Sequence, residues 1–181
     1  MKIFRTALAG LSLLALVSCK NTSADAATPE IQEVSTFYFI RHAEKDRSNP
    51  DNPDPELIQR GLGRAMHWAE ILNHVPLDAI YSTDYARTTM TAAPTSVKKD
   101  ITVQYYDPST LDIEKLKADH LGQHVLVVGH SNTTPDLVNK MLGEPRYEAM
   151  DDADNGSLFI VTLVGRQATA TRLYFNCNCP E

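Results

Sequence analysis

The sequence predicts an α/β fold with three layers, in which helices cover both faces of a mostly parallel central sheet. Short apolar runs rich in β-branched residues alternate along the chain with longer segments whose apolar residues recur at helical spacing. This alternation is typical of parallel sheets that are covered on both faces. The last two apolar runs, residues 158–164 and 168–175, flank Gly165. We expect them to close the sheet as an antiparallel hairpin.

The expected elements follow one another from residue 34 to residue 175. The run 34–40 is apolar, aromatic and β-branched, which is typical of a buried strand. The expected strands are residues 34–40, 78–82, 101–106, 124–128, 158–164 and 168–175, and the expected helices are residues 57–73, 85–97, 110–119 and 133–142. In the first helix, the apolar residues that repeat at helical spacing and are expected to pack on the sheet are Ile58, Leu62, Ala65, Met66, Ala69 and Leu72.

Residues 1–18 are predicted to be the signal peptide of a bacterial lipoprotein. Lys2 and Arg5 precede an apolar stretch, residues 7–17, that is too short to span a bilayer. Residues 16–19, Leu-Val-Ser-Cys, are similar to a lipoprotein cleavage box. We expect cleavage before Cys19 and acylation of its thiol and its new amine, which would anchor the chain stably. The alternative is an ordinary secretory signal with an accidental cysteine.

The predicted location is therefore the cell envelope, on the periplasmic side or at the outer membrane, with the lipid as the only membrane contact. Residues 19–33 are rich in Ala, Thr, Ser and Asn, and we expect a flexible tether there. Residues 34–181 suit one domain with one core. Removal of residues 1–18 takes away Lys2 and Arg5 and no acidic residue, so the formal charge of −6 becomes −8. This charge argues against a nucleic-acid binder, and an anionic substrate would need a local basic pocket.

Charged and polar residues follow three of the expected strands. Arg41 and His42 come directly after the first strand, and His130 follows the strand 124–128. Because sites in parallel α/β sheets lie at the C-terminal ends of strands, we expect the two histidines to meet there. Arg87 falls in the first turn of the helix 85–97, where the helix dipole disfavours a cation, and its presence there indicates a bound anion. A lone histidine after a strand has a simpler interpretation as a loop residue, but the combination favours a phosphate site.

These residues resemble the histidine phosphatase superfamily, the phosphoglycerate-mutase-like proteins. The family signature Arg-His-x-Glu is matched by residues 41–44, and the late Gly-His element by residues 129–130. The Leu-Thr-x-x-Gly element is similar to residues 57–61, with Ile58 where Thr is usual. The Ser-x-x-x-x-Arg-x-x-x-Thr-Ala element is matched by Ser82, Arg87, Thr91 and Ala92. The resemblance covers about residues 36–163.

The resemblance implies a phosphomonoesterase that works through a phosphohistidine intermediate, with His42 as the nucleophile. Such a nucleophile needs a neutral imidazole in which a carbonyl holds one nitrogen as a donor, and nearby cations disfavour its charged form. Arg41 and Arg87 can fork onto phosphate oxygens without losing their charge. His130, if protonated, would add a third cation and a donor.

The general acid is less clearly marked. One branch of the family has Asp directly after the second histidine, and this chain has Ser131 there. Other members place an acid just after the third strand, where Asp107 stands, although Asp107-Pro108-Ser109 is also a turn signal. Glu44 is the alternative donor, or else an ion-pair partner that orients Arg41 or Arg87.

Metals and cofactors are not required by this interpretation. Residues 151–154, Asp-Asp-Ala-Asp, lack the Gly and distal Glu of a calcium-binding loop and are interpreted as a turn before a strand. Cys177 and Cys179 could form a tight disulfide or a weak metal site, and export favours the disulfide.

Two other functions stay open alongside the phosphomonoesterase. One is a phosphotransferase of the phosphoglycerate mutase type. The other is a lipoprotein that binds a phosphorylated ligand without turning it over. The expected partner is a phosphorylated small molecule or a phosphorylated cell-envelope saccharide.

Overall fold

The computed structural model describes residues 32–179, so the predicted signal peptide, Cys19 and most of the predicted tether lie outside the described residues. Residues 32–179 form a six-stranded sheet with the strand order β3-β2-β4-β1-β5-β6. The strands are β1 (Val34–Arg41), β2 (Ala79–Ser82), β3 (Val103–Tyr105), β4 (His124–Gly129), β5 (Ser157–Val164) and β6 (Gln167–Tyr174). The helices are α1 (Gln59–Ile71), α2 (Ala86–Lys99), α3 (Ile113–Asp119) and α4 (Thr133–Leu142).

The sheet is mostly parallel and closes with an antiparallel hairpin, as expected. Strands β1, β2, β3 and β4 pair in parallel with one another. β5 runs antiparallel to β1, and β6 runs antiparallel to β5. The largest shift from an expected boundary is at α3, which begins at Ile113 because Asp112 caps it by accepting a hydrogen bond of 3.0 Å from the backbone N–H of Lys115.

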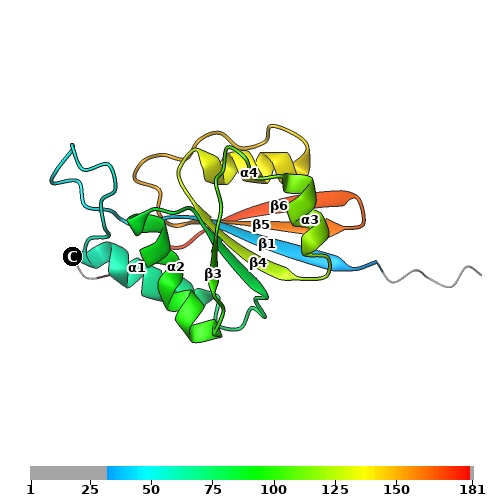
Figure 1. Ribbon diagram of the computed structural model, residues 1–181, viewed down its shortest axis with the longest axis horizontal. Coiled ribbons are helices and arrows are strands. Elements are labelled where there is room, and N and C mark those ends of the chain that lie inside the picture. The colour runs from blue at the N-terminus through cyan, green and yellow to red at the C-terminus, as the bar shows by residue number, and fades with distance from the viewer. Residues whose placement is uncertain (1–31, 180–181) are drawn as a thin grey trace, which may run out of the picture. The chain divides into compact units, whose positions relative to one another are not determined.

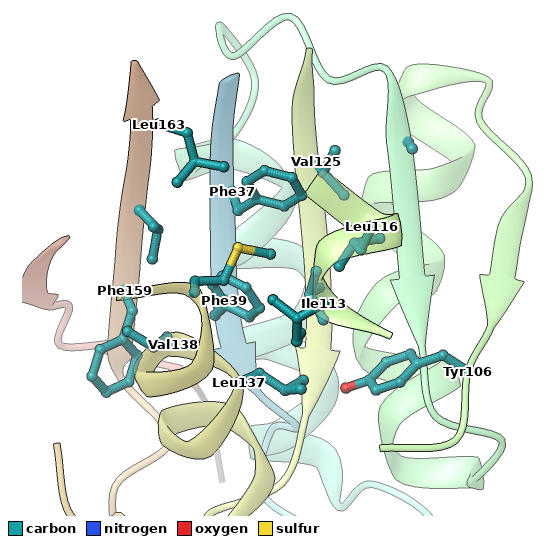
Figure 2. Close-up of a cluster of buried hydrophobic side chains, with 14 of the residues drawn as sticks. Phe37, Phe39, Tyr106, Ile113, Leu116, Val125, Leu137, Val138, Phe159 and Leu163 are labelled. Carbon is teal, nitrogen blue, oxygen red and sulfur yellow. The ribbon is translucent and has the colours of Figure 1, made fainter. Parts of the chain in front are cut away.

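Helices cover both faces of the sheet, with α1 and α2 on one face and α3 and α4 on the other (Figure 1). The pleat of β1 divides its side chains between the two cores. Phe37 and Phe39 are fully buried in the cluster that contains residues of α3 and α4 (Figure 2), whereas Ile40 belongs to the cluster that contains Trp68 of α1. Burial of each such side chain stabilises the fold by roughly 1.5–3 kcal/mol. The predicted three-layer α/β fold is confirmed.

The face of α1 that packs on the sheet differs from the expected one. Ala65, Ala69 and Leu72 are buried as predicted, but Met66 is 56 % exposed and Ile58 and Leu62 are also exposed. Trp68, which is 1 % exposed, fills the centre of the contact instead. The buried face also carries Gly61 and Arg64. The prediction for Ile58, Leu62 and Met66 is therefore wrong.

The loop after β1 explains this rotation of α1. A Cβ atom at Gly61 would collide with the carbonyl oxygen of Glu44, so glycine allows the helix to approach the loop. Arg64 then lies next to the Glu44 carboxylate and donates three hydrogen bonds of 2.8–3.0 Å to it. A buried charge needs such a partner, and these contacts require Arg64 to face inward.

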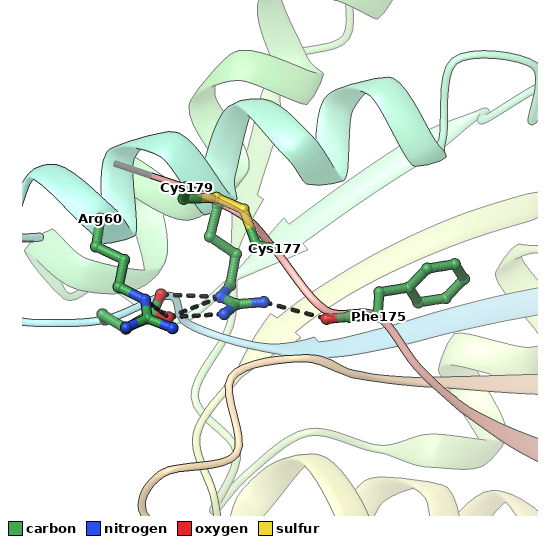
Figure 3. Close-up of a disulfide and its surroundings, with 6 residues drawn as sticks. Arg60, Phe175, Cys177 and Cys179 are labelled. Atoms are coloured by element: carbon green, nitrogen blue, oxygen red, sulfur yellow. Dashed lines mark hydrogen bonds and ion pairs between the residues drawn. A yellow bond between two sulfur atoms is a disulfide. The ribbon is translucent and has the colours of Figure 1, made fainter. Parts of the chain in front are cut away.

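The C-terminal segment contacts the same loop network. Arg64 donates a hydrogen bond of 3.3 Å from Nη1 to the carbonyl oxygen of Phe175. Cys177 and Cys179 form a disulfide just beyond it (Figure 3). Within residues 32–179, no helix is both long enough and apolar enough to cross a membrane.

Candidate active site

A pocket of about 630 Å³ lies at the C-terminal ends of β1, β2 and β4. β1 and β4 end side by side, because Arg41 is in register with Gly129 and the backbone N–H of His42 donates a hydrogen bond of 2.9 Å to the carbonyl oxygen of Gly129. This pairing brings the first motif and the late Gly-His element to one edge of the sheet. The pocket is lined by Arg41, His42, Lys45, Thr83, Asp84, Tyr85, Arg87, Tyr106, Asp107, Pro108, His130, Ser131, Asn132, Thr133 and Asp152.

His42 is held as a neutral imidazole with one free nitrogen. Its Nδ1 lies 2.8 Å from the carbonyl oxygen of Ala43, and since a carbonyl can only accept, Nδ1 carries the proton. Nε2 then keeps its lone pair. Burial and, to a smaller extent, the charges of Arg41, His130 and Arg87 together lower the pKa of His42 to about 3, against the opposing effect of the hydrogen bond to Ala43. At neutral pH, Nε2 of His42 is therefore an unprotonated base.

The backbone around His42 is fixed from two sides. Asn155 donates a hydrogen bond of 2.8 Å from its amide nitrogen to the carbonyl oxygen of His42. The hydroxyl of Thr91 in α2 accepts a hydrogen bond of 2.9 Å from the N–H of Ala43 and donates one of 2.7 Å to the carbonyl oxygen of Arg87. Thr91, which matches the family motif, thus ties the loop of His42 to the turn that carries Arg87.

Arg41 is 2 % exposed and is held by the segment 151–154. Its Nη1 donates to the carbonyl oxygens of Asp151 (2.9 Å), Asp152 (2.9 Å) and Asp154 (3.3 Å), and its Nη2 pairs with the Asp152 carboxylate at 2.7 Å. The turn predicted for this segment therefore has a further role that sequence reasoning missed. Hydrogen bonds to backbone carbonyls cannot be predicted from the type of residue. The three acids close together before β5 were nevertheless a signal for a buried cation.

Arg87 lies in the first turn of α2, and the structure shows an anion beside it. The carboxylate of Asp54 pairs with Nη1 of Arg87 at 3.2 Å and accepts from the backbone N–H of Ala86 at 2.9 Å and 3.1 Å. The guanidinium also lies 4.3 Å from the ring centre of Tyr85. Asp54, which the sequence analysis did not single out, thus supplies part of the negative charge expected at this helix end.

Both arginines retain an unused donor. Among the described residues, the buried Nε atoms of Arg41 and Arg87 have no hydrogen-bond partner. Buried guanidinium N–H groups are costly to leave unpaired. Because both side chains line the pocket, an anion with several acceptor oxygens is the ligand that fits this pair.

His130 faces His42 across the pocket, with ring centres 5.5 Å apart. Its Nε2 lies 2.9 Å from Oγ1 of Thr83. Burial lowers the pKa of His130 to about 4, and the charges of Arg87, Arg41 and Lys45 act in the same direction. The ring is therefore neutral at pH 7, and the expected third cation would require a bound anion that raises this pKa.

The two candidates for the general acid are both held by neighbouring residues. Asp107 lines the pocket. Its Oδ1 accepts hydrogen bonds of 2.8 Å from the backbone N–H of Ser109 and 2.7 Å from the hydroxyl of Ser109, and both lower the pKa of Asp107. This is the turn that the sequence also indicated. Glu44 is paired with Arg64 and, at 3.5 Å, with Arg60, and not with Arg41 or Arg87 as expected (Figure 3). Neither arrangement favours proton donation.

Comparisons with known proteins agree with this geometry. The family model described as histidine phosphatase superfamily (branch 1) matches residues 37–108, which include Arg41, His42 and Arg87. A search of curated proteins finds no match. The histidine phosphatase SixA, solved in complex with tungstate, is 15 % identical with a TM-score of 0.60, covering 77 % of this chain and 96 % of its own.

The chain has the fold of the histidine phosphatases. Two further solved structures share it. A mycobacterial glucosyl-3-phosphoglycerate phosphatase is 15 % identical with a TM-score of 0.59, covering 81 % of this chain and 100 % of its own. A phosphoglycerate mutase from Bacillus anthracis is 15 % identical with a TM-score of 0.59, covering 78 % of this chain and 93 % of its own. The histidine phosphatase fold therefore extends past the matched residues to the half of the chain that carries His130.

Proposed function

We propose that this chain is a phosphomonoesterase of the histidine phosphatase superfamily, which acts through a phosphohistidine on a phosphorylated substrate outside the cytoplasm. One observation carries the proposal. His42 is neutral, with Nδ1 held by the Ala43 carbonyl, and it lines one pocket with two arginines whose buried Nε–H groups have no partner among the described residues. This arrangement combines a nucleophile with donors for phosphate oxygens.

The reaction proceeds in two displacements. The lone pair of His42 Nε2 attacks phosphorus, the ester P–O bond breaks, and the leaving oxygen takes a proton from water. Arg41 and Arg87 bind the non-bridging oxygens, whose charge they neutralise throughout. A water molecule then attacks phosphorus, the N–P bond breaks, and inorganic phosphate leaves. The hydrogen bond from Nδ1 to the Ala43 carbonyl keeps the ring oriented in both steps.

The substrate preference depends on whether the site offers a proton donor to the leaving group. Because Ser109 holds the carboxylate of Asp107 and Arg64 holds that of Glu44, we infer that the enzyme prefers leaving groups that need little assistance from an acid. Aryl phosphates and phosphorylated imidazoles are of this kind, and one solved protein of the same fold is the protein histidine phosphatase SixA. Phosphorylated small molecules and cell-envelope saccharides remain the proposed natural partners, and a substrate panel ranks these classes.

The test is a trapping experiment on His42. Brief exposure to a labelled aryl phosphate and a denaturing quench should leave phosphate on the protein, in a bond that is labile in acid and stable in alkali, as expected for phosphohistidine. His42→Ala should abolish both label and turnover, because no covalent route remains. His130→Ala should slow both, with any label still at His42. His74→Ala is the matched control, since His74 is exposed and precedes β2, whereas the pocket follows it.

Other outcomes separate the alternatives. Label on Ser131 or Asp107, or full activity of His42→Ala, would overturn the assignment. Phosphoryl transfer between sugar acids without phosphate release would indicate the mutase. Binding of phosphate without label or release would indicate a non-catalytic lipoprotein.

A further inference from the structure

The ring of His130 is held at one nitrogen by a hydroxyl from the end of β2. Thr83 is 1 % exposed and lines the pocket, and its Oγ1 lies 2.9 Å from Nε2 of His130. Thr83 belongs to none of the motifs that identify the site. Distance alone does not say which of the two atoms donates the hydrogen, and this choice fixes the tautomer of His130.

The neighbouring hydroxyl of Thr88 decides the direction. Thr88 is fully buried, and its Oγ1 lies 2.8 Å from the carbonyl oxygen of Thr83 and 2.9 Å from that of Tyr85. Since carbonyls can only accept, the single hydroxyl proton of Thr88 points at them. The Thr83 hydroxyl lies 3.0 Å from Oγ1 of Thr88 and therefore donates to it. With its proton used, Thr83 Oγ1 can only accept from His130.

We propose that Thr83 is a positioning residue that holds His130 as the tautomer with its proton on Nε2, so that Nδ1 is the ring atom offered to the phosphoryl group. The inference rests on the proposed function and adds a residue to it. When a phosphate ester binds, Nδ1 takes up a proton from the monoanion of the ester or from water. The new N–H group then donates a hydrogen bond to a phosphate oxygen. Both N–H groups of the resulting imidazolium then have acceptors, Thr83 at Nε2 and phosphate at Nδ1.

The proposal assigns different tasks to the hydroxyls around α2. Thr91 fixes the loop of His42, whereas Thr83, supported by Thr88, fixes the ring of His130. Thr95, one turn further along α2, is also 1 % exposed, and its hydroxyl has no hydrogen-bond partner among the described residues. Thr95 is therefore a matched control, because Thr95→Val removes a buried hydroxyl of the same kind without touching the pocket.

The experiment reads the tautomer directly. Protein labelled with ¹⁵N-histidine is examined at pH 7 by two-bond ¹H–¹⁵N correlation spectra, with the His130 signals assigned from their loss in His130→Gln. We expect the Nε2–H pattern in the wild type and its loss or mixing in Thr83→Val. Turnover of an aryl phosphate by Thr83→Val should fall roughly tenfold, the effect of one lost hydrogen bond. Thr83→Ser should restore both, and Thr95→Val should change neither.

The prediction for the tautomer and the prediction for turnover can be refuted separately. A wild type that shows the Nδ1–H pattern overturns the positioning role even if the enzyme is fully active, and this reading does not depend on any variant folding. A Thr83→Val protein with unchanged tautomer and unchanged kcat also overturns it, as does a Thr83→Ser protein as impaired as Thr83→Val. A wild type without phosphatase activity, but with an Nε2–H pattern that depends on Thr83, supports the positioning role and refutes the proposed function.

Discussion

Arg41 and Arg87 are held in different ways, although both line the pocket. Three backbone carbonyls and the Asp152 carboxylate surround the guanidinium of Arg41, which is almost fully buried. Arg87 has one carboxylate partner, Asp54, whose side chain is 45 % exposed. Arg41 is thus rigidly placed before a ligand arrives, whereas Arg87 can exchange an exposed partner for phosphate.

The fork of Arg87 can be tested by two substitutions at residue level. Arg87→Ala removes the charge, and Arg87→Lys keeps a charge near Asp54 but has no Nε–H. If the fork binds phosphate, each variant should lose on the order of a hundredfold in kcat/KM on an aryl phosphate, the scale for one preorganised donor. Arg166→Lys, in the exposed turn between β5 and β6, is the control. Wild-type kcat/KM in Arg87→Lys would show that the assigned geometry is wrong.

The two pocket histidines also predict how stability depends on pH. Their pKa values are about 3 and about 4 in the folded protein, against about 6.5 in the unfolded chain. Above pH 7 both states are neutral and nothing differs. As pH falls from 7 towards 4, the unfolded chain takes up protons that the folded protein does not, so the free energy of unfolding falls.

Urea unfolding at pH 7 and pH 5 measures this effect. The double variant His42→Asn/His130→Asn should lose less stability between these pH values than the wild type, because two groups that protonate only on unfolding are gone. Carboxylates contribute equally to both proteins, so the comparison isolates the histidines. An identical pH dependence of the two proteins would contradict the depressed pKa values.

At the scale of elements, the order and type of strands and helices follow from the apolar patterns, and the orientation of α1 does not. Ala65, Ala69 and Leu72 belong to the predicted face and to the observed one, so helical spacing alone could not separate the two. The contact that decides the orientation of α1 is that of Gly61 with the carbonyl oxygen of Glu44 in the loop after β1. Such a contact depends on loop conformation, which has no periodic signature.

The same distinction applies to the candidate site. Arg41, His42, Arg87 and His130 could be placed together from sequence, because each follows a strand at the same edge of the sheet. Asp54 and Thr83 could not, since a carboxylate in a polar loop and a threonine after a strand are common in any chain. Their importance comes from distances that only the folded chain defines.

The orientation of α1 predicts opposite outcomes for two large apolar residues. Trp68→Ala should lower the free energy of unfolding by about 3–5 kcal/mol, because it leaves a cavity between α1 and the sheet. Met66→Ala should change it by less than about 0.5 kcal/mol, since Met66 is mostly exposed. Urea denaturation at pH 7 measures both. Equal losses would mean that α1 packs with the face that the sequence favoured.

At the scale of the whole molecule, charge is distributed unevenly. The chain carries a formal charge of −6, and the pocket is lined by Arg41, Lys45 and Arg87 but also by Asp84, Asp107 and Asp152. An anionic substrate is therefore attracted only at short range, by the buried Nε–H groups of the two arginines that have no partner among the described residues.

The proposed lipid anchor depends on Cys19, which lies outside the described residues. Wild-type protein expressed in a bacterium should incorporate labelled fatty acid, because residues 16–19 are similar to a lipoprotein cleavage box. Cys19→Ser should remain unprocessed by lipoprotein signal peptidase and should incorporate none. Cys179→Ser, which keeps Cys19, is the control. Equal labelling of wild type and Cys19→Ser would refute the proposed anchor.

The carbonyl cage around Arg41 affects how relatives of this chain are to be compared. Asp151 and Asp154 contribute main-chain oxygens to Arg41, and their carboxylates hold the turn itself, because Asp151 accepts from the N–H of Ala153 and Asp154 accepts from the N–H groups of Gly156 and Ser157. An insertion or deletion between residues 151 and 154 would move three acceptors at once. In an alignment of homologues, a constant spacing from this segment to β5, together with acids at positions 151 and 154, would therefore indicate that the acceptors around Arg41 are retained.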